Sequence, residues 1–231
     1  MSSSGRSFSR RSVPRWALPQ SVLSRRLPRR NRGDKPVIVV VASSYDAHAR
    51  SIVAHWESGC ATILTAEDLC RLGWSVSVPR SGGGAAVIGG RIVRPDQISG
   101  ILTLRPGVFA PELRAIHPDD RAYVAAELNA FLLEWLMAQS CPVLNRPSFS
   151  CLAGPNWRME QWIHVAARLG VPVRTCRRHA CNDCSPRAEE HAVEIISVGE
   201  HCFGCDDPRL QSWNRRLAEA AARAAPGTRS P

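Results

Sequence analysis

Two Cys-x-x-Cys pairs form the clearest set of metal-binding side chains in this sequence. Cys181 and Cys184 make the first pair, and Cys202 and Cys205 make the second, with 17 residues between the pairs. This spacing is typical of a zinc ribbon, in which two knuckles on strand hairpins place four thiolates tetrahedrally around one metal ion. We therefore predict a zinc site formed by these four cysteines.

A second interpretation of the same segment stays open. Zinc-ribbon knuckles usually carry a glycine directly after the second cysteine, but Ser185 and Asp206 stand at these positions. In this alternative, residues 176–207 form a loop and a hairpin whose cysteines bind no metal. Several neighbouring side chains are suitable as replacement ligands: Cys176, His179, His191 and His201.

A further group of polar residues lies directly after runs that are typical of strands. These runs are 37–42, 98–104 and 142–144. In a parallel sheet, ligands bind beyond the carboxyl ends of the strands. We therefore predict a substrate site at this edge, formed by Ser44, Asp46, Arg105, Asn145 and Arg146.

Some of these residues also have a structural alternative. Asp46 is well placed to cap the helix that follows it, and we favour that role. Arg105 suits a clamp on a carboxylate or phosphate, or an ion pair with Glu112 or Glu127. Asn145 lines the cleft or satisfies a turn.

The elements that position these residues follow from hydrophobic periodicity and from turn residues. Apolar or alternating runs predict strands at 37–42, 61–64, 74–78, 85–88, 91–93, 98–104, 142–144 and 193–198. Helical spacing predicts helices at 47–58, after a cap at Asp119 or Asp120, at 156–169 and at 208–225. A capping box is expected from Thr65 to Asp68.

This alternation of strands and helices predicts an α/β fold. We expect a three-layer, Rossmann-like domain at 35–175, with a mostly parallel sheet and helices on both faces. The small Cys-rich segment 176–207, a possible zinc ribbon, and a C-terminal helix within 208–231 follow it. Residues 1–34 are expected to be a disordered, Arg- and Ser-rich tail.

Several short motifs occur in an order that points to one enzyme superfamily. They are the run from Val37 that leads to Asp46 and His48, Leu102-Thr-Leu-Arg-Pro106, the helix with Tyr123 and Glu127, Pro142-Val-Leu-Asn-Arg-Pro147, and Gly170-Val-Pro-Val-Arg-Thr175. Together they resemble the front (pre-ATP-grasp) domain of ATP-grasp carboxylate–amine ligases. The branch with ribosomal-protein glutamate ligases and peptide-macrocyclising ligases is the most similar.

The resemblance implies a Rossmann-like domain that helps to hold a carboxylate substrate and supports a nucleotide site. Complete enzymes of this family use Mg-ATP to activate a carboxylate as an acyl phosphate, which an amine then attacks. The family often carries a phosphate-binding lysine about eleven residues before the position of Gly170, and Met159 stands there. The neighbouring Arg158 is the candidate cofactor-binding cation, although its planar fork differs from a lysine's point charge.

Only 56 residues follow Thr175, so we expect a truncated relative that lacks the ATP-grasp lobes. The expected role is an accessory or substrate-binding module without independent ligase activity, beside an ATP-grasp ligase partner or as a homo-oligomer. One alternative is an ATP-dependent carboxylate–amine (peptide) ligase completed by a partner, with ATP and magnesium bound only if that partner supplies the nucleotide domain. Another alternative is a zinc-binding protein whose basic arm contacts nucleic acid.

Positive charge is concentrated at the N-terminus. Residues 1–34 hold nine Arg and one acid, Asp34, and so contribute +8 of the formal net charge of +10. The tail fits a solvated arm, weak contact with nucleic acid or anionic lipid, an organelle transit peptide or an upstream-extended start. Because no secretory signal and no run of 18 apolar residues occurs, we expect a cytoplasmic protein without a membrane span.

Overall fold

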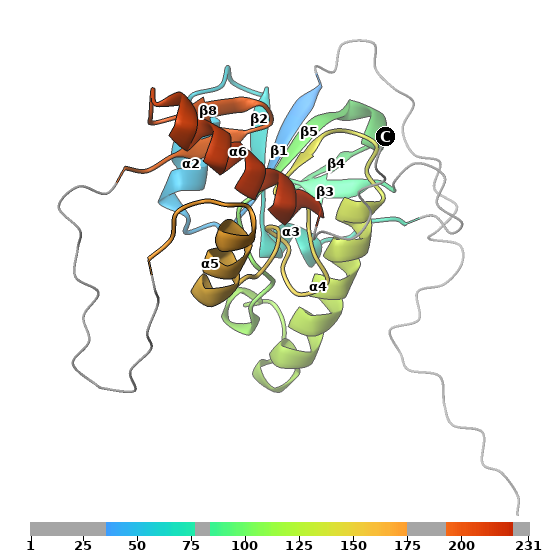
Figure 1. Cartoon of the computed structure of the whole chain (residues 1–231). Coiled ribbons are helices and arrows are strands. Elements are labelled where there is room, and N and C mark those ends of the chain that lie inside the picture. The colour runs from blue at the N-terminus through green and yellow to red at the C-terminus, as the bar shows by residue number, and fades with distance from the viewer. Residues whose placement is uncertain (1–35, 77–83, 175–192, 224–231) are drawn as a thin grey trace, which may run out of the picture. The chain divides into compact units, whose positions relative to one another are not determined.

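A four-stranded parallel sheet lies at the centre of the described residues. The computed structural model describes residues 36–76, 84–174 and 193–223. In sheet order, the strands are β2 (Ala61–Leu64), β1 (Val37–Val41), β5 (Ile98–Thr103) and β6 (Val143–Leu144). Each neighbouring pair is parallel, so the carboxyl ends of the strands lie along one edge (Figure 1). We call it the carboxyl edge.

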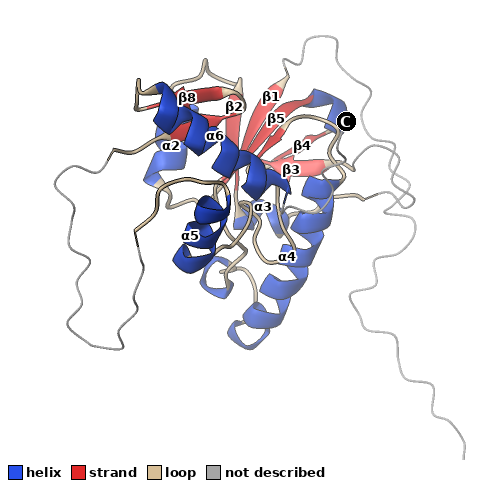
Figure 2. Cartoon of the chain, in the orientation of Figure 1, coloured by secondary structure: helices blue, strands red, loops and turns tan. Residues whose placement is uncertain are grey.

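Strand β1 is apolar throughout because both of its faces are covered. Successive side chains of a strand point to opposite faces of the sheet. Val39 and Val41 belong to a core cluster that includes residues of α4 (Arg121–Met137). Val40 packs in a second cluster with Ala49 of α2 (Ala47–Ala54). Helices thus cover both faces (Figure 2), which confirms the predicted α/β class.

The long helix α4 covers one face of the sheet with large side chains. Leu132, Trp135 and Leu136 are all 0% exposed, and full burial of such a side chain stabilises the fold by about 1.5–3 kcal/mol. Trp74 lies edge-on against Phe131 and Trp135, with ring centroids 5.4 and 5.5 Å apart. This geometry is favourable for aromatic pairs and anchors the segment after α3 to the helix.

A small antiparallel hairpin is attached to α3 through a buried carboxylate. The hairpin consists of β3 (Ala86–Ile88) and β4 (Arg91–Val93), joined by a tight turn. Asp68, in α3 (Ala66–Leu69), is 4% exposed. It accepts hydrogen bonds from the turn amides of Gly89 (3.2 Å) and Gly90 (3.0 Å). It also accepts bonds from the backbone and the hydroxyl of Thr65, both at 3.2 Å.

A second hairpin, the C-terminal hairpin, comprises β7 (Ile196–Val198) and β8 (His201–Phe203) and packs on α6 (Pro208–Arg223). Asn214 of α6 donates a hydrogen bond to Ser197 Oγ at 2.6 Å. Helix α6 also contacts α5 (Met159–Arg168). None of the described helices is long and apolar enough to cross a bilayer.

Several sequence predictions are confirmed. The strand at 61–64 and the capping box from Thr65 to Asp68 are present as expected. The two strands on either side of Gly89 and Gly90 pair as a hairpin. Short 3-10 helices, which the sequence did not indicate, occupy Pro95–Gln97, Ala110–Glu112 and Pro118–Asp120.

Other predictions of elements were wrong. Residues 74–76 form no strand, since Trp74 instead packs on α4 and donates its indole N–H to Asp68 O at 2.8 Å. Asp120 stands at the N-cap of α4 without a side-chain cap bond, because the chain enters that helix through a 3-10 turn. Helix α2 ends at Ala54 rather than at residue 58, and α5 begins at Met159 rather than at residue 156.

Candidate functional site

Three loops meet at the carboxyl edge: 42–46 after β1, 104–113 after β5 and 145–158 after β6. Backbone and side-chain hydrogen bonds hold their first residues together. Leu104 N donates to Val41 O at 2.9 Å, and Asn145 Nδ2 donates to Thr103 O at 3.0 Å. The predicted substrate-binding residues Ser44, Asp46, Arg105, Asn145 and Arg146 therefore lie on adjacent loops of one edge.

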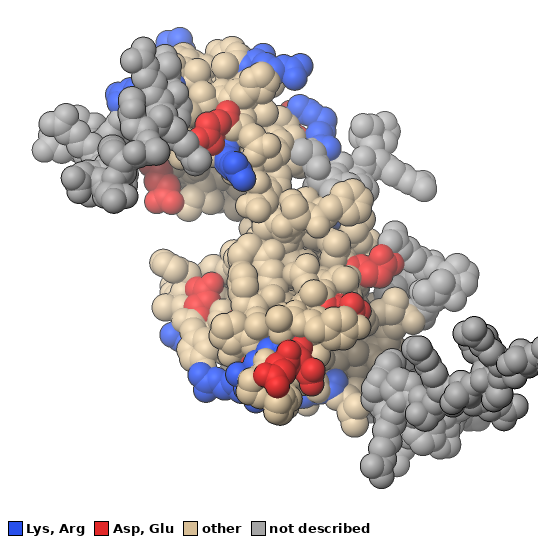
Figure 3. Space-filling model, turned by 90° about the horizontal axis from the view of Figure 1, so that it is seen from below, with Lys and Arg blue, Asp and Glu red and all other residues tan. Residues whose placement is uncertain are grey.

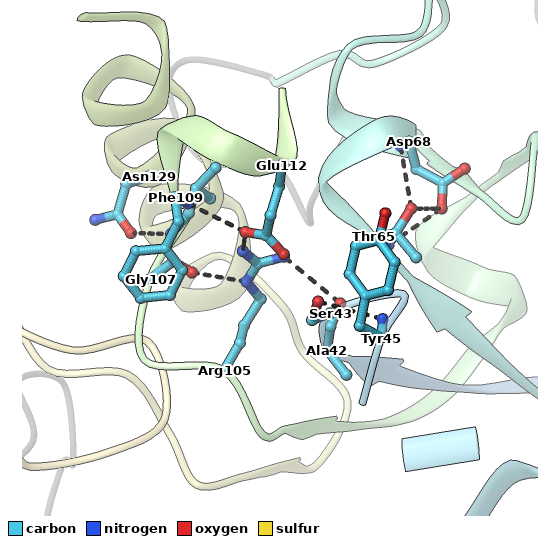
Figure 4. A network of polar contacts seen from close by, with 11 residues as sticks. Ala42, Ser43, Tyr45, Thr65, Asp68, Arg105, Gly107, Phe109, Glu112 and Asn129 are labelled. Carbon is cyan, nitrogen blue, oxygen red and sulfur yellow. Dashed lines mark hydrogen bonds and ion pairs between the residues drawn. The ribbon is translucent and has the colours of Figure 1, made fainter. Parts of the chain in front are cut away.

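Arg105 is the buried centre of the loop after β5. Its side chain is 4% exposed and forms an ion pair with Glu112 of the 3-10 helix Ala110–Glu112. It also donates to Gly107 O at 2.8 Å and to Ala42 O at 3.5 Å, as Figure 4 shows. The ion pair with Glu112, one of the two roles considered for Arg105, is the one present here. Its guanidinium joins the loops after β1 and β5.

In the loop after β1, polar groups organise the start of α2. Asp46 Oδ1 accepts from the amides of His48 (2.9 Å) and Ala49 (3.1 Å), so this carboxylate caps the helix. Arg50 Nη1 donates to Ser44 O at 2.8 Å. The Ser44 side chain is exposed at the edge.

The loop after β6 begins with a residue whose backbone is in the left-handed conformation. Asn145 has φ 54°, a conformation that asparagine tolerates better than most residues, and its side chain bonds back to β5. Arg146 follows it and is half-buried. Burial raises the pKa of the nearby Cys141 thiol, while a backbone hydrogen bond and the Arg146 charge lower that pKa by smaller amounts. Cys141 is therefore a protonated thiol at neutral pH rather than a nucleophilic thiolate.

One residue at the edge, Arg114, was not selected from the sequence. Tyr45 is 62% exposed, and the guanidinium carbon of Arg114 lies 5.6 Å from the centre of its ring. This is a cation–π arrangement. The rule for ligand sites in parallel sheets points to Tyr45 as well as to Ser44, since both follow the first strand. Arg114 gave no such signal, because it lies in a segment without hydrophobic periodicity.

The unpaired charge at this edge is positive. Arg50, Arg114 and Arg146 form no ion pair with any acidic side chain within 36–76, 84–174 and 193–223. Two acids of the loops at this edge are engaged elsewhere, Asp46 in the helix cap and Glu112 with Arg105. Elsewhere the charges mix, and Figure 3 shows basic and acidic side chains interspersed on one face of the described residues.

Arg158, the predicted cofactor-binding residue, lies at the start of α5. It is exposed and occupies the N-cap position, where its backbone N–H donates to Gln161 Oε1 at 2.8 Å. It follows Trp157 directly, at the end of the loop that begins after β6.

Of the four cysteines predicted to bind zinc, Cys202 and Cys205 are described, whereas Cys181 and Cys184 lie outside the described residues. Cys202 is on β8, and Cys205 follows Gly204, which has φ 89°. The Cys205 sulfur accepts the backbone N–H of Asp207 at 3.3 Å. The described part of the chain contains no cluster of three or more His, Cys, Asp or Glu side chains arranged for a metal ion.

The chain was compared with protein-family models, with curated proteins and with solved structures. No family model, no curated protein and no solved structure matches the chain.

Proposed function

We propose that this protein is a binding module that holds a small anionic ligand, a carboxylate or a phosphate, at the carboxyl edge of its sheet. This role agrees with the accessory or substrate-binding function expected from the resemblance to the front domain of ATP-grasp carboxylate–amine ligases. The observation that carries the proposal is a set of three guanidinium groups that have no acidic partner within the described residues. Arg50 lies in the first half of α2, Arg114 follows the loop after β5, and Arg146 lies in the loop after β6.

The chemistry of these groups favours an anion. Guanidinium groups bind carboxylates and phosphates through charge-assisted hydrogen bonds, which are about twice as strong as neutral ones. The exposed hydroxyl groups of Ser44 and Tyr45 add donors on the same loop. The buried pair of Arg105 and Glu112 fixes the neighbouring loop, so less ordering is needed when a ligand binds.

Titration calorimetry of the full chain with glutamate, succinate and inorganic phosphate tests the proposal. At least one of these anions is expected to bind, and Arg114→Gln or Arg146→Gln is expected to weaken its binding at least about tenfold, since a hydrogen bond to a charged group contributes about 1.5–3 kcal/mol. Arg91→Gln is the matched control, because Arg91 is exposed on β4, outside the three loops that follow β1, β5 and β6. Equal weakening by all three variants, or no binding at all, contradicts the proposal.

The ligase alternative predicts a different response of the same protein. A chain that holds the nucleotide itself is stabilised by Mg-ATP, because any ligand that binds only the native state raises its melting temperature. The accessory role instead predicts stabilisation by the carboxylate or phosphate ligand, and no more stabilisation by Mg-ATP than by inorganic phosphate or adenosine at the same concentration. Thermal unfolding with each ligand separates the two.

Zinc binding is a second candidate function, supported by the contact at Cys205. The N–H of Asp207 points at the Cys205 sulfur, and hydrogen bonds of this kind orient the ligands of metal sites. Elemental analysis of the purified chain is expected to give about one zinc per chain, lost in Cys184→Ser and Cys202→Ser and kept in Cys60→Ser. A chain without zinc, or zinc that survives these substitutions, refutes this candidate.

A further inference from the structure

A pocket of about 290 Å³ opens between the loop after β6 and the first turn of α5. Its size is near the lower end of the range for small-molecule pockets, about 300–1,000 Å³. The pocket therefore has room for one flat ring system rather than for a large ligand. Both aromatic and polar side chains line it.

Two aromatic side chains line the pocket. Phe149 is 80% exposed, although a large apolar side chain in water loses the free energy that burial provides. Trp157 is half-buried and packs edge-on against Trp162, with ring centroids 4.7 Å apart and an angle of 69° between the ring planes. The indole of Trp157 is thus held in place, while the face of Phe149 is available for stacking.

The polar groups of the pocket carry donors and acceptors together. Gln161 uses its Oε1 to accept the Arg158 amide, which leaves its Nε2 to donate to a ligand. The exposed side chains of Ser150 and Asn156 add a hydroxyl and an amide. The edge of a nucleobase presents both donors and acceptors. A plain hydrocarbon ring would leave these groups unpaired, which disfavours it.

The loop is well ordered by its own hydrogen bonds. Ser148 Oγ donates to Gly154 O at 2.9 Å, and Ser148 N donates to Cys151 O at 2.8 Å. Leu152 N donates to Pro106 O at 2.9 Å, which ties this loop to the one after β5. A pocket held in this way requires little ordering on binding.

We propose that this pocket binds a nucleobase, stacked on Phe149 and hydrogen-bonded along its edge by Gln161. The site does not depend on the proposed anion site, because none of its lining residues is among the guanidinium groups assigned there. It also assigns a role to Phe149, whose exposure nothing else in the described residues explains.

Calorimetry of the full chain with adenosine, guanosine, cytidine and uridine, and with benzyl alcohol as a ring without a hydrogen-bonding edge, tests this proposal. At least one nucleoside is expected to bind more tightly than benzyl alcohol. Phe149→Ala is expected to weaken that nucleoside at least about fivefold, the lower end of what loss of a stacked base contact costs. Gln161→Glu, which keeps the oxygen that accepts from Arg158 and removes the amide donor, is expected to weaken it as well.

Phe203→Ala is the matched control, because Phe203 is an exposed aromatic on β8 outside the pocket. It is expected to leave nucleoside binding unchanged. Phe149 is so exposed that its truncation leaves the fold intact, which circular dichroism verifies. Failure of all four nucleosides to bind, equal affinity of benzyl alcohol, or equal affinity of the Phe149→Ala variant overturns the proposal.

Discussion

Arg105 and Glu112 show how much one buried ion pair contributes to the edge of the sheet. The two side chains are 4% and 15% exposed. Removal of one partner from a buried pair leaves an uncompensated charge, which costs about 3–5 kcal/mol. The pair therefore stabilises the loop after β5 and is not available as a ligand clamp while it is intact.

Glu112→Ala is expected to lower the free energy of unfolding by about 3–5 kcal/mol. Glu219→Ala is the control, because Glu219 forms an exposed i,i+4 pair with Arg223 on α6 and such pairs contribute less than about 1 kcal/mol. Urea denaturation gives both values. Equal losses of stability in the two variants would show that the pair of Arg105 and Glu112 contributes no more than an exposed ion pair.

The thiol of Cys141 reports on the charge of Arg146. Burial raises the pKa of this thiol, and the positive charge of Arg146 opposes the rise. Arg146→Ala is therefore expected to raise that pKa further, so that less thiolate is present at a given pH and alkylation is slower. The measurement is the pH midpoint of iodoacetamide labelling of the Cys141 peptide, read by mass spectrometry. Arg91→Ala should leave the midpoint unchanged, and a midpoint that moves in neither variant contradicts the assigned electrostatics.

Among the secondary elements, the β3–β4 hairpin depends on a single side chain of α3. Asp68 accepts hydrogen bonds from two glycine amides of the turn and from Thr65, so all four of these groups donate to its carboxylate oxygens. Replacement by Asn places an amide NH₂ against those donors and removes the charge. Hydrogen bonds to a charged group contribute about 1.5–3 kcal/mol.

Asp68→Asn is accordingly expected to destabilise the protein by about 2 kcal/mol and to accelerate hydrogen exchange at Gly89 and Gly90 more than elsewhere. Asp96→Asn is the control, since Asp96 is exposed and forms an ion pair with Arg94 at 3.6 Å. Exchange that accelerates equally across the sheet would show that Asp68 stabilises the whole domain rather than the hairpin.

Elements that depend on local sequence were the easiest to predict. The capping box from Thr65 to Asp68 is a four-residue pattern, and the apolar run of β1 identifies a strand covered on both faces. By contrast, Trp74 was assigned to a strand because its neighbours alternate, but contacts with α4, some 60 residues away in sequence, decide its environment. The predicted end of α2 was also wrong by four residues, since no local signal ends the helix at Ala54 rather than at residue 58.

For the candidate site, the sequence predicted which loops form it but not which contacts its residues make. The rule for parallel sheets located the loops that contain Ser44, Arg105 and Asn145. The sequence could not decide which acid pairs with Arg105, because Glu112 and Glu127 are both plausible by spacing. Nor did it indicate that Arg114 lies over Tyr45, since that contact depends on the path of an irregular loop.

For the whole molecule, the distribution of charge separates the N-terminal residues from the rest. Residues 1–34 contribute +8 of the net +10, which leaves +2 for residues 35–231. Non-specific affinity for a polyanion depends on the number of cations that contact it and falls steeply with salt. Such affinity is therefore expected to reside in residues 1–34.

Deletion of residues 1–34 is expected to lower the salt concentration at which the protein elutes from heparin and to flatten the salt dependence of RNA binding. The affinity of the same truncated chain for the anionic ligand at the carboxyl edge is expected to stay unchanged, and this serves as its control. Elution at an unchanged salt concentration would place the polyanion contact on the body instead.

The hydrogen bond from Leu152 N to Pro106 O joins the loop of the nucleobase pocket to the loop of Arg105. Because the two loops share this bond, a displacement of the first loop by an occupant of its pocket also acts on the second. Such thermodynamic linkage is reciprocal: by whatever factor one occupant changes the affinity for the other, the second changes the affinity for the first by the same factor. One backbone amide thus gives two neighbouring sites a route to cooperativity.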